Sequence, residues 1–156
     1  MKIATGQKAP DFSLFDTEKN KVSVSGQKGH NIVLLFFPLA FTGVCTKELC
    51  SVRDNIALYN NANARVYGIS VDAPATLSKF RAEQGLNFPL LSDFNKEAST
   101  AYGALYEEFI GWMKGVSKRS AFIIDKEGVV QYAEVLENAG ELPNFEAIKT
   151  TLSRLN

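Results

Sequence analysis

Two cysteines, Cys45 and Cys50, have the clearest chemical potential in this chain, and four residues separate them. A thiol acts as a nucleophile, redox group or metal ligand in its thiolate form. Pro38 and Thr42 precede Cys45 in a short loop, which makes this segment the first candidate for a site. Because the chain has only one histidine, His30, these thiols cannot complete a tetrahedral zinc site, and the histidine itself is expected in a turn. The pattern favours nucleophilic or redox chemistry and no bound metal.

The predicted elements around Cys45 would activate its sulfur. Residues 32–37 form a continuous apolar run that ends at Pro38, as expected of a central strand covered on both faces. Apolar residues then recur at helical spacing from about 42 to 60, so Cys45 falls in the first helical turn. Unpaired backbone N–H groups and the positive dipole end favour an anionic sulfur there, with Thr42 expected as the N-cap. A nearby arginine would add to the effect, but spacing does not show which one.

The remaining elements alternate between strands and helices. A 156-residue chain with 46% hydrophobic residues can bury one substantial core, so we expect a single domain over residues 1–156. The order predicts a three-layer α/β fold with a mixed sheet. The predicted elements are an N-terminal hairpin or extended arm at 11–15 and 22–24, strands at 65–71 and 88–91, helices at 75–84, 98–106 and 144–155, and a hairpin at 121–124 and 129–135.

Charge and composition exclude several functional classes. Lysine plus arginine and aspartate plus glutamate number 17 each, so no net field attracts nucleic acid or an anionic membrane. No apolar stretch approaches the ~18 residues of a membrane span, and the N-terminus has no secretory pattern. Two cysteines are too few for a disulfide scaffold. We therefore expect a cytoplasmic protein with small-molecule or protein partners, no nucleic acid and no membrane.

The pattern Pro38-x-x-x-Thr42-x-x-Cys45 is similar to the active-site signature of the peroxiredoxin (AhpC/TSA) family. The resemblance extends over most of the chain and implies a thioredoxin-like fold, three-layer α/β/α, with a central mixed sheet and an N-terminal hairpin extension. It also implies that no metal or organic cofactor is needed. Further segments that carry the resemblance are 9–12, 71–72, 88–93 and 119–125.

The resemblance implies a thiol peroxidase whose peroxide site contains Pro38, Thr42, Cys45 and Arg119, with Glu48 at a common family position. The Cys45 thiolate would attack the O–O bond of hydrogen peroxide or an organic hydroperoxide and become a sulfenic acid. Thr42 would bond the thiolate and a peroxide oxygen, Pro38 would shield the sulfur from water, and Arg119 would stabilise negative charge. Glu48 would position the arginine, unless it is an exposed partner of a neighbouring lysine.

Two branches of the family predict different fates for the sulfenic acid. The segment from Phe36 to Cys45 resembles alkyl hydroperoxide reductase E, whereas a cysteine at the position of Cys50 resembles bacterioferritin comigratory protein, or peroxiredoxin Q. On an ideal helix the two Cα atoms would be roughly 8 to 9 Å apart, and a disulfide needs less than about 7 Å. If Cys50 resolves the sulfenic acid, the start of the helix must unwind; otherwise Cys50 is a small buried residue and the cycle uses one cysteine.

Partners follow from the same resemblance. It implies recycling by thioredoxin or a similar thiol reductant. The first branch implies a homodimer and the second a monomer, and the apolar stretch 109–113 could cover the active site, form a dimer surface or pack in the core. A redox sensor or relay that passes oxidation from Cys45 to a bound protein is the rival function, and the sequence does not separate the two.

Overall fold

The fold is built around β3 (Asn31–Phe36), all six residues of which are buried. The computed structural model describes residues 2–155. Strand β3 pairs in parallel with β4 (Ala64–Ser70) on one side and antiparallel with β6 (Ser120–Ile124) on the other. A strand in this position has both faces covered, which explains why its sequence is a continuous apolar run and not an alternating one.

The sheet extends outward from this centre to seven strands in the order β2-β1-β5-β4-β3-β6-β7. One edge is formed by the N-terminal hairpin of β1 (Ser13–Asp16) and β2 (Lys21–Ser23), which joins the sheet through antiparallel pairing with β5 (Leu90–Ser92). At the other edge β7 (Val130–Val135) pairs antiparallel with β6. Parallel and antiparallel pairs together make the sheet mixed.

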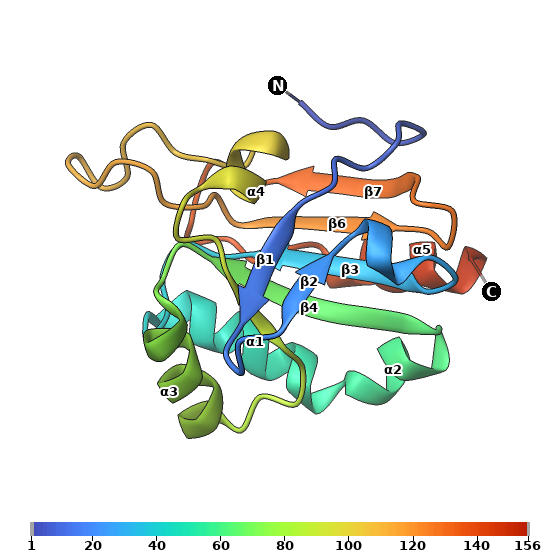
Figure 1. Cartoon of the computed structure of the whole chain (residues 1–156), viewed down its shortest axis with the longest axis horizontal. Coiled ribbons are helices and arrows are strands. Elements are labelled where there is room, and N and C mark those ends of the chain that lie inside the picture. Colours follow the sequence, from blue (N-terminus) through green and yellow to red (C-terminus); the bar gives the residue numbers. More distant parts are fainter. Residues whose placement is uncertain (1, 156) are drawn as a thin grey trace.

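Helices and the N-terminal segment cover the two faces (Figure 1). One core cluster packs Leu49, Phe80 and Ile148 against one face of the sheet, and the other packs Tyr102 and Phe12 against the opposite face. The helices are α1 (Gly43–Asp54), α2 (Ile56–Asn61), α3 (Pro74–Gln84), α4 (Glu97–Ala101) and α5 (Phe145–Arg154), with a 3-10 turn, η1, at Ser25–Gln27. The predicted three-layer α/β/α architecture with an N-terminal hairpin is confirmed.

The structure refines the helix that follows the central strand. The expected helix over residues 42–60 is interrupted at Asn55, which separates α1 from α2. Cys45 lies in the first turn of α1, as the apolar spacing predicts. Thr42 occupies the N-cap position, but the expected side-chain capping bond is absent because its hydroxyl donates to the Leu39 carbonyl at 2.8 Å. None of the helices within residues 2–155 is long and apolar enough to cross a membrane.

Candidate active site

The loop from β3 to α1 is held in a tight, irregular course. Phe41 adopts a left-handed conformation with φ of 65°, which bulky residues rarely do, and its ring packs edge-on against Phe80 at 5.1 Å. The backbone N–H of Ala40 donates to a carboxylate oxygen of Asp72 at 2.8 Å, and Ser70 donates to the same oxygen. These contacts place the start of α1 beside the end of β3.

Cys45 and Arg119 meet at this point although they are 74 positions apart. The antiparallel pairing of Phe36 with Ser120 sets Arg119 beside the end of β3. Both side chains are almost fully buried, and Nη2 of Arg119 donates to Sγ of Cys45 at 3.2 Å. A guanidinium in this position stabilises a thiolate in a low-dielectric environment.

Glu48, one turn after Cys45 on the same helix, completes a buried charged group. Its Oε1 accepts from Nη1 of Arg119 at 2.7 Å, while Oε2 is buried without a hydrogen-bond partner. Burial raises the pKa of Glu48 to about 7, although Arg119 acts in the opposite direction. Burial also opposes the charge of Arg119, but Glu48 and Cys45 outweigh it and raise the Arg119 pKa. The expectation that Glu48 contacts the arginine is confirmed, and the alternative of an exposed helical pair is wrong.

Arg119 also contacts the backbone carbonyl of Ala139, which sequence reasoning did not find. Nε and Nη2 of Arg119 donate to the carbonyl oxygen of Ala139 at 3.2 and 3.0 Å. Together with Glu48 this contact fixes the guanidinium plane against Cys45. A carbonyl is present in every residue, so no residue type could have indicated it.

A pocket of about 260 Å³ opens onto Cys45 and Arg119. Two of the predicted site residues, Pro38 and Thr42, lie in its wall, and Glu48 lies behind the arginine and outside the lining. The other lining residues are Leu39, Gly43, Val44, Phe109, Ala139 and Gly140. Phe109 belongs to the apolar stretch 109–113, for which a place over the active site was one of the expectations. Four of the predicted site residues thus share one pocket, and Glu48 contacts one of them, Arg119, from outside the pocket.

Cys50 lies outside that pocket. It is half-buried, and its Sγ is 3.6 Å from Oε1 of Gln84 at the end of α3. The sulfurs of Cys45 and Cys50 are not joined. The same part of α1 is tied to its surroundings by Arg53, which donates to the Gln84 carbonyl, and by Asn87, which donates to the Arg53 carbonyl at 3.2 Å.

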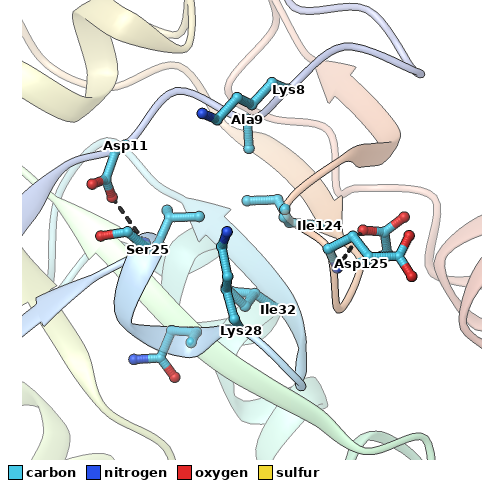
Figure 2. Close-up of a pocket in the computed structure, with 12 residues that line it drawn as sticks. Lys8, Ala9, Asp11, Ser25, Lys28, Ile32, Ile124 and Asp125 are labelled. Atoms are coloured by element: carbon cyan, nitrogen blue, oxygen red, sulfur yellow. Dashed lines mark hydrogen bonds between the residues drawn. The ribbon is translucent and has the colours of Figure 1, made fainter.

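The remaining candidates lie away from Cys45. His30 contacts Asn63 and Arg65 at the entry to β3. Among residues 2–155 no group of three or more His, Cys, Asp or Glu side chains is placed to hold a metal ion. Another pocket, of about 140 Å³, is lined by Lys8, Asp11, Lys28, Ile32 and Ile124 among others (Figure 2). Because Ile32 lies at the start of β3 and Cys45 follows its end, this pocket is at the opposite end of the strand.

Comparison with known proteins agrees with this arrangement. The AhpC/TSA family model matches residues 5–133. The chain belongs to the AhpC/TSA family. It is 38% identical over 143 residues to alkyl hydroperoxide reductase E of Mycobacterium tuberculosis. The alignment covers 90% of each chain. The family assignment makes the protein a peroxiredoxin, an oxidoreductase with thiol-dependent peroxidase activity.

Solved structures of this family share the fold. Peroxidoxin BcpB of Mycobacterium tuberculosis aligns with a TM-score of 0.86 at 28% identity and covers 99% of both chains. The Xanthomonas campestris bacterioferritin comigratory protein aligns with a TM-score of 0.82 over 92% of this chain and 90% of its own, and at 24% identity it supports the fold alone. The likeness in sequence is thus to alkyl hydroperoxide reductase E, whereas the bacterioferritin comigratory protein shares the fold.

Proposed function

We propose that Cys45 is the peroxidatic nucleophile and that it reduces hydrogen peroxide and organic hydroperoxides. The observation that carries the proposal is the buried contact of 3.2 Å between Arg119 Nη2 and Cys45 Sγ at the base of an open pocket. The thiolate attacks one peroxide oxygen, the O–O bond breaks, and the leaving oxygen takes a proton to depart as water or an alcohol. Cys45 is left as a sulfenic acid.

The neighbours of Cys45 have distinct roles in this proposal. Arg119 stabilises the negative charge that moves from sulfur to the leaving oxygen. Because the Thr42 hydroxyl donates to the Leu39 carbonyl, it has only acceptor capacity to offer the O–H of a peroxide. Pro38, which is buried, keeps bulk water from one side of the sulfur. Glu48 and the Ala139 carbonyl hold the guanidinium in place.

Cys50 is proposed as the resolving cysteine. Its thiol condenses with the Cys45 sulfenic acid, releasing water and forming an intramolecular disulfide that thioredoxin or a similar dithiol protein reduces. The residues Phe41 to Gly43 that lead into α1 are exposed, and the local unwinding that the disulfide requires would release the packing of Phe41 on Phe80 and the contact of Cys45 with Arg119. We further propose that residues 1–156 act as one domain in the cytoplasm, without a metal or organic cofactor.

The test uses the fully reduced protein and one equivalent of hydrogen peroxide, with intact mass and free thiols as readouts. In the wild type we expect rapid loss of both thiols as one intramolecular disulfide. Cys45→Ser should keep its remaining thiol, and Cys50→Ser should accumulate a sulfenic acid that a dimedone-type reagent traps. A wild type in which Cys50 stays alkylatable after oxidation would replace the two-cysteine cycle with the one-cysteine cycle, and an unreactive Cys45 would refute the peroxidase proposal.

A redox relay is the second candidate, because it begins from the same sulfenic acid. It predicts a mixed disulfide that accumulates with one protein partner instead of steady turnover with a small dithiol system. Non-reducing gels after oxidation separate the two outcomes. The same samples, run by sedimentation, distinguish a homodimer from a monomer.

A further inference from the structure

We infer that Phe109 is a specificity-determining residue that favours hydroperoxides with an apolar organic substituent over hydrogen peroxide. The inference rests on the proposed role of Cys45 and names the substrate class that its pocket selects. It follows from the size and lining of the pocket, from the way Phe109 is held, and from the fixed position of the opposite wall.

The pocket is far larger than hydrogen peroxide requires. Its volume is about 260 Å³, whereas a water molecule needs only about 10 to 15 Å³ by a comparable measure and hydrogen peroxide is about twice a water. Beyond Thr42, Cys45 and Arg119, the side chains that line the pocket are apolar or glycine. The peroxide group can use the polar end, which leaves apolar space for a substituent.

Phe109 is presented to this space by a hairpin between α4 and β6, which Figure 1 shows projecting beyond the end of the sheet. Phe109 and Met113 exchange backbone hydrogen bonds of 2.6 and 3.0 Å across the turn. The Phe109 ring packs on Tyr106 at 5.0 Å. At the tip, Ile110 and Gly111 both have positive φ, and Ile110 is 64% exposed while Phe109 is half-buried. The hairpin thus turns Phe109 toward the pocket, while Ile110 and Trp112 are exposed to solvent.

The opposite wall of the pocket is fixed relative to this hairpin. The Tyr106 hydroxyl donates to the Glu137 carbonyl at 2.7 Å, and Lys118 forms an ion pair of 2.7 Å with the Glu137 carboxylate. Two residues further on, the Ala139 carbonyl accepts from Arg119. The hairpin and the segment that contains Ala139 are thus joined through Glu137. A preformed pocket binds an apolar substituent without first ordering its walls, so more of the contact energy contributes to selection.

Selection arises because both classes of substrate present the same O–O bond to Cys45 and Arg119. Only an organic hydroperoxide can also contact the Phe109 ring, and hydrogen peroxide leaves that surface in water. An apolar contact of this kind is worth about a tenfold difference in kcat/KM. Removal of the ring should therefore affect one substrate class and spare the other.

The experiment compares single-turnover oxidation of Cys45 by cumene hydroperoxide and by hydrogen peroxide in the wild type, Phe109→Ala and Phe109→Leu. Ile110→Ala is the matched control, since it removes a large apolar side chain from the same hairpin but not from the pocket. We expect Phe109→Ala to slow the cumene hydroperoxide reaction about tenfold with hydrogen peroxide unchanged, Phe109→Leu to fall between, and Ile110→Ala to match the wild type. Equal slowing of both peroxides, or no change for either, would overturn the inference.

A binding measurement separates failure of this inference from failure of the proposed function. Cumyl alcohol, the unreactive product, is titrated against the reduced wild type and Phe109→Ala and followed by amide chemical shifts. Weaker binding to Phe109→Ala, together with a Cys45 that neither peroxide oxidises, would refute the peroxidase role and keep the apolar preference of the pocket. Equal binding to both proteins would refute the preference, whatever the reactivity of Cys45.

Discussion

The fold buries the Glu48 carboxylate at a cost in stability, and replacing Glu48 with glutamine removes that charge. The folded-state pKa of Glu48, about 7, lies above its ordinary value of 4.5 because burial disfavours the carboxylate. The stability that the protonated group contributes is therefore fully present below the unfolded pKa and is lost as pH rises through the folded pKa. The rise corresponds to about 3 kcal/mol of unfolding free energy, at about 1.4 kcal/mol for each pH unit.

Most of that loss falls between about pH 5 and about pH 8, and the Glu48→Gln variant should not show it. As pH rises over this interval, the unfolding free energy of the variant should thus increase by about 2 to 3 kcal/mol relative to that of the parent. In urea this corresponds to a relative shift of the unfolding midpoint of about 1 M. The variant also loses the carboxylate partner of the buried Arg119 cation, and this loss lowers its unfolding free energy at every pH.

The assay is equilibrium urea unfolding at several pH values, with Cys45→Ser in both proteins so that the site contains no thiol that could oxidise. The other carboxylates, including Glu134, are common to the two proteins, so their contributions cancel in the difference. The test depends only on how the difference in unfolding free energy changes with pH, because the part that does not change contains the cost of the lost ion pair. A difference that is flat with pH would refute the reasoning. It would mean that attraction by Arg119 outweighs burial and that Glu48 stays ionised throughout.

Two further predictions concern Arg119, which contacts Cys45, and Arg53, which ties α1 to the end of α3. Arg119→Lys should lower the rate of Cys45 oxidation about 100-fold. Arginine contacts Glu48, Cys45 and the Ala139 carbonyl from separate nitrogens of one rigid plane, whereas lysine carries all its donors on a single nitrogen. Stopped-flow oxidation measures the rate, and a value near that of the wild type would contradict the prediction. Arg53→Ala should speed formation of the Cys45–Cys50 disulfide after a pulse of peroxide, because the substitution frees the second half of α1 from the Gln84 carbonyl. Quenched-flow thiol alkylation measures the rate of disulfide formation. A slower rate would show that the Arg53 contact positions Cys50 for attack.

Local patterns were enough to predict the elements that surround the site. The apolar run of β3 and the helical spacing after it placed Cys45 in the first turn of α1, because both signals depend on residues close in sequence. The break at Asn55 was missed, since apolar residues continue in register into α2 and conceal the end of α1. The resemblance to peroxiredoxins supplied Arg119, which spacing alone could not.

The sequence by itself determined the fold class, the position of Cys45 at a helix start, and the residue types available to surround it. Only the tertiary structure decided how they meet. The register of β3 against β6 brings Arg119 to Cys45, the burial of α1 leaves one Glu48 oxygen unpartnered, and a hairpin outside the sheet places Phe109 over the pocket. These contacts join residues far apart in the chain. They depend on strand register and packing, which no short stretch of sequence encodes.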